Sequence, residues 1–252
     1  MADSGEGPRI EVTIAAPVET VWQALRDPRL IRRWHGWDFD GLDEEVQSIY
    51  LTGVTEDATA HVLEVGGSDR FSLHSSGEGT VVRLTRAPIG TFPEWDAYYD
   101  DITEGWYTFL HQLRFGLERH GLAERRTVFI EGTLEEPGVL VDALGLREVA
   151  TLPPGSPYKA ETAAGGELSG QVWASSPYQL LLTVEQFGDG LAVLAQQPHA
   201  AHRPEGGVLA VLTTYGLDDP AFTKVESRWT AWWERHRVVP DDDVIDPGTP
   251  PA

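Results

Sequence analysis

One stretch constrains the fold of this chain more than any other: residues 95–120 have the periodicity of a long helix. Their apolar side chains recur at helical spacing along one stripe, made of Ile102, Trp106, Phe109, Leu110, Leu113 and Leu117. Pro93 marks the start, and Gly121 follows a basic last turn as the residue that tolerates a left-handed stop. The pattern predicts an amphipathic helix wide enough to cover a sheet. The stripe by itself is more typical of an ordinary core than of a binding pocket.

The residues before this helix predict a sheet. Residues 9–15 alternate as a strand with one buried face, and Pro17 begins a helix that is followed by a second short one near Leu30. Four further strands are predicted at 45–51, 58–65, 70–75 and 80–86, with glycines between them. Because the connections are short, the strands should be antiparallel neighbours.

Two strings of the sequence resemble the START-like (SRPBCC) superfamily, and within it the activator of heat-shock-protein-90 ATPase homologue family: IEVTIAAPVETVWQALRDPRLIRRWHGW and ITEGWYTFLHQLRFGLERHG. The resemblance implies an α+β helix-grip fold, in which a curved antiparallel sheet wraps around a long C-terminal helix and leaves a cavity. It implies no single reaction, since members bind lipids, polyketides or hormones and a few do chemistry.

The second half of the chain is similar to a degenerate copy of the first. Strands are predicted at 127–134, 168–174, 179–186, 190–196 and 207–215, and a closing helix at 219–236. Residues 152–155 should form a loop, and the Ala/Gly-rich residues 161–167 a mobile one. Pro137 stands where Pro17 stood and Trp229 where Trp106 stood, an offset of about 120 residues that suits a whole domain. The predicted organisation is a helix-grip domain at 1–122, a second at 123–240, and an acidic, Pro-rich tail at 241–252.

Composition excludes several classes of function. The formal net charge of −21 argues against nucleic acid and against an anionic membrane surface, because both attract basic proteins. The chain has no cysteine, which removes disulfides, thiolate catalysis and Cys-ligated metals. His199 and His202 have no third ligand at a convincing spacing, so no metal and no cofactor is predicted. No leader or membrane-spanning run is present, which predicts a cytoplasmic protein without membrane insertion.

The candidate ligand-binding residues are the side chains expected around the cavity. They comprise aromatics of the segment that lids the cavity in the resembling family, inward-facing strand positions and the helix stripe: Trp34, Trp37, His61, Phe71, Tyr98, Ile102, Trp106, Tyr107, Phe109, Leu110 and Leu113. Trp34, Trp37 and Trp106 could contact a ligand or could simply be large core residues. Both interpretations stay open, because large aromatics dominate cores as well as pockets.

Three functions are compatible with these residues. Binding of a small hydrophobic or amphipathic ligand, lipid- or polyketide-like, ranks first. Regulation of a partner protein ranks second, by resemblance to the heat-shock ATPase activators, and the acidic surface and tandem arrangement suit it. The degenerate second copy could serve as the dimerisation partner of a homodimer. A cyclase- or hydrolase-type reaction that uses His61, Tyr107 or His111 ranks third, so binding is favoured over catalysis.

Overall fold

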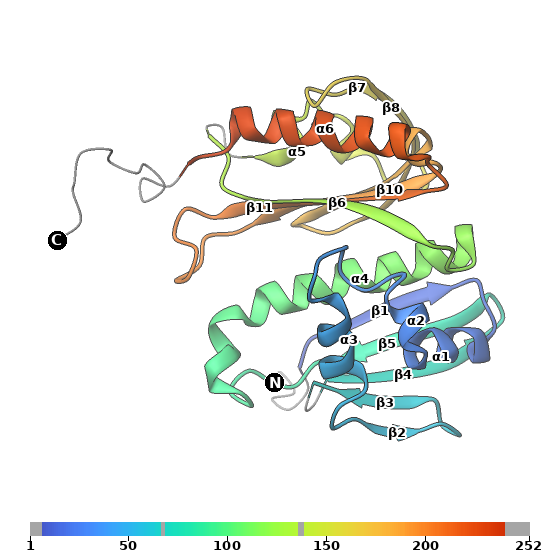
Figure 1. Ribbon diagram of the computed structural model, residues 1–252. Coiled ribbons are helices and arrows are strands. Elements are labelled where there is room, and N and C mark those ends of the chain that lie inside the picture. The colour runs from blue at the N-terminus through green and yellow to red at the C-terminus, as the bar shows by residue number, and fades with distance from the viewer. Residues whose placement is uncertain (1–6, 67–68, 136–138, 240–252) are drawn as a thin grey trace.

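The computed structural model describes residues 7–66, 69–135 and 139–239, and it contains two antiparallel sheets, each with a long helix (Figure 1). The first sheet has the strand order β1-β5-β4-β3-β2. We call this sheet together with its helix α4 the first grip. Its elements are β1 (Arg9–Ile14), α1 (Val18–Arg26), α2 (Pro28–Ile31), α3 (Leu42–Tyr50), β2 (Thr55–Asp57), β3 (Val62–Val65), β4 (Asp69–Ser76), β5 (Gly79–Thr85), the 3₁₀ turn Pro93–Tyr98 and α4 (Tyr99–His120).

The second sheet has the strand order β6-β11-β10-β9-β8-β7, and we call it together with α6 the second grip. Its elements are β6 (Arg125–Gly132), α5 (Leu140–Ala143), the 3₁₀ turns Val149–Thr151 and Glu185–Phe187, β7 (Pro157–Glu161), β8 (Glu167–Ser175), β9 (Gln179–Val184), β10 (Gly190–Gln197), β11 (Gly207–Tyr215) and α6 (Asp219–His236). The predicted tandem helix-grip fold is therefore confirmed. The division at residue 122 stays a prediction, and the predicted tail at 241–252 and Pro137 lie outside the described residues.

Helix α4 ends where its periodicity predicts but begins at Tyr99, because residues 95–98 of the predicted helix belong to the 3₁₀ turn. Its 22 residues follow the 3₁₀ turn and end at Gly121, whose φ of 55° is left-handed. A side chain at this position would be strained, so the glycine is a conformational requirement of the helix end.

The predicted strand at 45–51 is wrong, because these residues belong to helix α3. Leu42, Val46 and Tyr50 are its buried residues, and their spacing of four places them on one helical face. The predicted strand at 58–65 is wrong in its first half, since β3 begins only at Val62. The carboxylate of Asp57 accepts hydrogen bonds from the backbone N–H groups of residues 59 and 60, which turns the chain before β3.

Strand β7 has no counterpart among the predicted elements. It pairs antiparallel with β8, from Pro157 opposite Gln171 to Glu161 opposite Glu167. Burial of Tyr158, whose hydroxyl donates to the carbonyl oxygen of Thr183 at 2.8 Å, fixes this edge strand to the sheet. The strand has only five residues and begins at a proline, which explains why the sequence pattern does not show it.

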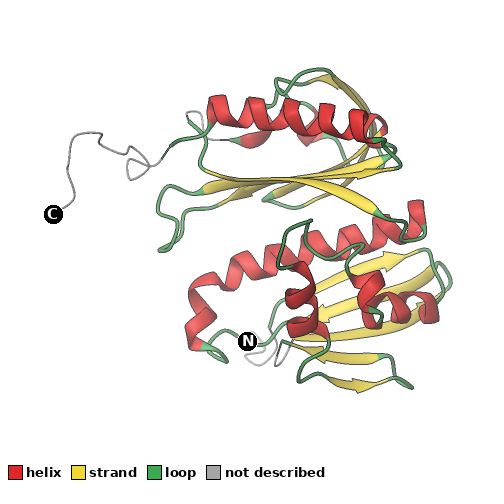
Figure 2. Cartoon of the chain, in the orientation of Figure 1, coloured by secondary structure: helices red, strands yellow, loops and turns green. Residues whose placement is uncertain are grey.

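Helix α4 lies between the two sheets, so the chain is built in four layers: α6, the second sheet, α4 and the first sheet (Figure 2). Trp106, Leu110 and Leu113 pack toward the first sheet. Phe115, on another face of α4, packs against apolar residues of β9, β10 and β11. Every residue of β9 is buried, because one face of the strand lies toward α6 and the other toward α4.

Candidate functional site

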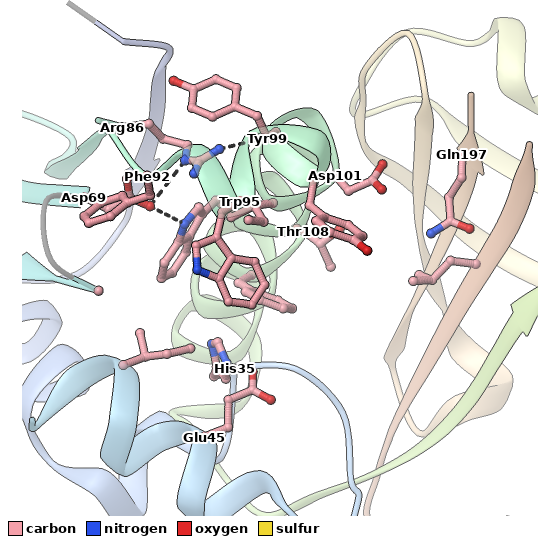
Figure 3. Close-up of a pocket in the computed structure, with 18 of the residues that line it drawn as sticks. His35, Glu45, Asp69, Arg86, Phe92, Trp95, Tyr99, Asp101, Thr108 and Gln197 are labelled. Carbon is pink, nitrogen blue, oxygen red and sulfur yellow. Dashed lines mark hydrogen bonds and ion pairs between the residues drawn. The ribbon is translucent and has the colours of Figure 1, made fainter. Parts of the chain in front are cut away.

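A cleft of about 760 Å³ surrounds the N-terminal half of α4 (Figure 3). Its first wall is formed by residues 35–37 and α3, its second by the connection from β5 to α4, and its third by β6, β10 and β11 of the second grip. The second sheet covers the C-terminal half of α4 through Phe115, whereas the first turns of α4 remain partly exposed. The cleft therefore lies at the end of α4 where packing by the two sheets is incomplete.

Aromatic side chains form much of the cleft wall. Trp95 and Tyr98 project from the 3₁₀ turn with exposed fractions of 57% and 42%. Trp106 and Phe109 lie deeper on α4, with ring centroids 6.1 Å apart, and Trp37 stacks on Phe129 of β6 at 3.8 Å and so joins the two grips. Exposed aromatic rings at a cleft supply apolar area that only a bound molecule would cover.

Arg86 and Asp69 form an ion pair that organises the second wall. Arg86 is only 7% exposed, its Nε lies 3.3 Å from Asp69 Oδ2, and its guanidinium donates to Tyr99 O at 2.6 Å and to Thr103 Oγ1 at 2.8 Å. The indole Nε1–H of Trp106 donates to the same Asp69 oxygen at 2.8 Å. Both charges are thus satisfied within the protein, and the pair fixes the orientation of Trp106.

A hydrogen-bonded chain runs from Glu45 and His35 in the first wall to the buried Tyr50 behind it. His35 Nε2 is 2.8 Å from Glu45 Oε1, and His35 Nδ1 is 2.9 Å from the Tyr50 hydroxyl. Because a carboxylate only accepts, Nε2 carries the proton and Nδ1 accepts from the hydroxyl. Burial lowers the pKa of His35 and raises that of Tyr50 well above its usual range, so both are neutral at pH 7.

A second ion pair joins the two grips at the edge of the cleft. Asp101 of α4 accepts from both terminal nitrogens of Arg203, at 2.9 and 2.8 Å, and lies 2.7 Å from His202 Nε2. The hydrogen bond from Arg203 is the main reason why the pKa of Asp101 is lowered. The ring of Tyr98 lies 4.3 Å from that of His202. Residues a hundred positions apart in the chain are therefore fixed together at the edge of the cleft.

Eleven residues were predicted from the sequence to contact a ligand, and the structure brings five of them to the cleft: Trp37, Tyr98, Ile102, Trp106 and Phe109. They come from the segment after α2, the 3₁₀ turn and one face of α4. Their role in binding remains a proposal.

The other six predicted residues lie elsewhere. Four are fully buried and pack together in the apolar core of the first grip: Trp34, Phe71, Leu110 and Leu113. Tyr107 faces the second sheet, where its ring lies 4.5 Å from that of His111. His61 lies in the turn before β3, against Trp22 and Glu19. The inward strand position expected for His61 is wrong, because Asp57 turns the chain there.

Several residues of the cleft were not predicted from the sequence. Glu45 lies in a segment whose pattern predicts a strand, and His35 lies in a segment whose two tryptophans dominate the pattern. Glu131, Leu209 and Val211 come from the second sheet. The WHGW string was the one local signal that could have pointed to His35, since a polar ring between two tryptophans needs a partner when buried.

The buried histidine His111 should make stability depend on pH. Burial lowers its pKa to about 4 from an ordinary value of 6.5. The unfolded chain therefore takes up the proton first as pH falls, so the stabilisation is complete above pH 6.5 and is lost toward pH 4. We expect about 2 kcal/mol of the free energy of unfolding to disappear between pH 6.5 and 4.5 on this account.

Denaturant titrations of His111→Met at several pH values would measure how much of the pH-dependent free energy of unfolding is due to His111. The variant should lose less stability between pH 6.5 and 4.5 than the natural protein, although His35 contributes in the same direction and is retained. His74→Asn, at an exposed strand position, is the matched control. An unchanged pH dependence in His111→Met would contradict the prediction.

The described residues hold no group of three or more His, Cys, Asp or Glu side chains placed to bind a metal ion. His199 instead contacts Pro204 O, and His202 contacts Asp101. Within the same part of the chain, no helix is both long enough and apolar enough to cross a membrane.

The sheets and helices define the chain as a tandem helix-grip protein with a cleft between its two grips. No protein-family model matches the chain, and no curated protein matches it. Three solved structures illustrate what the chain is similar to.

DynU16, a protein in the dynemicin biosynthetic locus, is 17% identical, with 90% of this chain and 96% of that chain covered and a TM-score of 0.32. The di-domain ARO/CYC StfQ from the steffimycin biosynthetic pathway is 10% identical, with 88% and 90% covered and a TM-score of 0.33. An AHSA1-like protein from Rhizobium etli is 25% identical, with 44% and 81% covered and a TM-score of 0.31. Because these scores are low, the fold assignment depends on the chain's own sheets and helices.

Proposed function

We propose that the protein binds a small apolar or amphipathic molecule, of the size of a lipid or a polyketide, in the cleft around the N-terminal half of α4. The observation that carries this proposal is a cleft of about 760 Å³ whose wall is largely apolar and rich in aromatic side chains, and whose polar groups are held in place by buried partners. Ligand pockets in proteins typically measure about 300–1,000 Å³ and combine an apolar wall with a few oriented polar groups.

The geometry favours a cleft shared by both grips over a cavity within the first grip alone. The interior of the first grip is filled by Trp34, Tyr50 and Phe71, each fully buried. Leu209 and Val211 of β11 supply apolar surface on the opposite side of the cleft. The second grip thus contributes to the proposed site as a wall.

The other predicted roles have no comparable structural observation behind them in the described residues. The regulation of a partner protein, the homodimer and the cytoplasmic location each stay a prediction. A cyclase- or hydrolase-type reaction through His61, Tyr107 or His111 is not proposed, because none of the three lines the cleft.

Titration with 9-anthracenemethanol, followed by anthracene fluorescence, tests the proposal. The natural protein should bind one molecule saturably, with energy transfer from the tryptophans of the wall. Trp95→Ala should weaken binding by about tenfold, because the exposed indole loses an aromatic contact worth about 1–1.5 kcal/mol with a bound ring.

The matched control is Tyr178→Ala, which removes an aromatic side chain of 43% exposure outside the cleft. It should leave the affinity unchanged. Absence of saturable binding, or equal weakening in the two variants, would contradict the proposed function.

A further inference from the structure

The charged groups of the cleft are mostly acidic. Two guanidiniums line it, and each is paired: Arg86 with Asp69, and Arg203 with Asp101. Three further carboxylates line it, those of Glu45, Asp96 and Glu131. Among the described residues, none of these three forms an ion pair with a lysine or an arginine. With the histidines counted as neutral, the wall carries a net charge of −3.

Glu45 has the best-defined position of the three carboxylates. Its Oε1 is held by Nε2 of His35, which is fully buried, and His35 is held in turn by the fully buried Tyr50. Because His35 is a neutral donor here, it orients the carboxylate without cancelling its charge. The Glu45 side chain is 39% exposed and lies at the wall of the cleft (Figure 3). Its charge is therefore free to act on a bound molecule.

Aromatic rings lie beside His35, the residue that holds this carboxylate. The His35 ring, which holds Glu45, is 4.4 Å from the Phe109 ring and 6.3 Å from the Trp106 ring. A protonated amine held against Glu45 would lie close to these rings, and aromatic faces attract cations within about 6 Å. An anion would meet the unpaired carboxylates and would have no unpaired arginine, since both arginines of the wall are already paired.

From this arrangement we infer that the ligand of the cleft is a cationic amphiphile, an apolar or aromatic body that carries a protonated amine bound by Glu45. The inference rests on the proposed function and specifies the chemical class of its ligand. His35 and Tyr50 act as positioning residues for the carboxylate.

Three anthracenes that differ in one substituent separate the alternatives: 9-(aminomethyl)anthracene, 9-anthracenemethanol and anthracene-9-carboxylate. At pH 7 and 0.15 M salt, the amine should bind about tenfold more tightly than the alcohol, and the carboxylate more weakly than both. Raising the salt concentration should weaken binding of the amine more than that of the alcohol.

Glu45→Gln tests the assigned anchor, because the amide oxygen can still accept from His35 while the charge is lost. We expect about a tenfold loss of affinity for the amine, a change of less than about twofold for the alcohol, and an unchanged melting temperature. Glu44→Gln removes a neighbouring, exposed charge of the same helix that does not line the cleft, and should leave both affinities nearly unchanged.

Equal affinities for the amine and the alcohol, or tightest binding of the carboxylate, would overturn the cationic ligand while the proposed function stands. Equal effects of Glu45→Gln and Glu44→Gln on the amine would overturn Glu45 as the anchor. Binding of none of the three anthracenes would overturn the inference together with the proposed function.

Discussion

Replacing Trp34 by alanine is expected to destabilise the protein by about 4 kcal/mol. Trp34 has no exposed surface, and its ring packs edge-on against Tyr50 with centroids 5.7 Å apart. Truncation would remove a large buried ring and leave a cavity in the first core. Such changes typically cost about 3–5 kcal/mol.

The indole of Trp34 also has a hydrogen-bonding role that alanine cannot replace. Its Nε1–H donates to the carbonyl oxygen of Ala24 at 2.9 Å. That oxygen lies in the last turn of α1, and the residue four positions later is Pro28, which has no N–H to offer. Trp34 therefore satisfies an acceptor that the helix itself leaves unpaired.

Guanidinium unfolding of Trp34→Ala, Trp34→Phe and Trp95→Ala would measure these contributions. Trp34→Phe keeps most of the buried ring and should cost about 1–2 kcal/mol, mainly for the lost hydrogen bond. Trp95→Ala, at 57% exposure, should change the stability by less than about 0.5 kcal/mol. A loss below about 1 kcal/mol in Trp34→Ala would show that Trp34 is not a core residue.

Gly105→Trp should weaken binding of the anthracene alcohol by about a hundredfold, equivalent to about 2.7 kcal/mol, without destabilising the fold. Gly105 lies on α4 in the wall of the cleft, one helical turn before Phe109. A Cβ atom built on it meets only Phe109 Cε2, at 4.0 Å. An indole at this position would therefore extend into the cleft and occupy the space of a ligand.

Gly105→Ala is the matched control for this experiment. Alanine adds one methyl group in open space and replaces a poor helix former, so it should stabilise the protein by up to about 1 kcal/mol and leave binding intact. Titration of both variants with the fluorescent probe, alongside their melting temperatures, separates blocking from unfolding. Undiminished binding by Gly105→Trp would show that the ligand does not bind in the cleft.

The local patterns of the sequence predicted most of the regular elements. The stripe of α4 and the end at Gly121 were predicted correctly, as were β4, β5 and α6. Helix α3 was missed, because its short apolar pattern around Val46 and Ile49 can be fitted by a strand as well as by a helix of nine residues. In the structure, packing of Tyr50 beneath Trp34 decides in favour of the helix.

The sequence by itself determined the two amphipathic helices and the strand-rich segments before each, because hydrophobic periodicity is a property of neighbouring residues. The tertiary structure alone decided where the cleft lies and which residues line it. Leu209 and Val211 line the cleft only because the second sheet packs on α4. Hydrogen bonds from Thr108 to Gln179 and from Arg203 to Asp101 hold this packing together. Contacts between residues so far apart depend on how whole layers pack, and no local period encodes them.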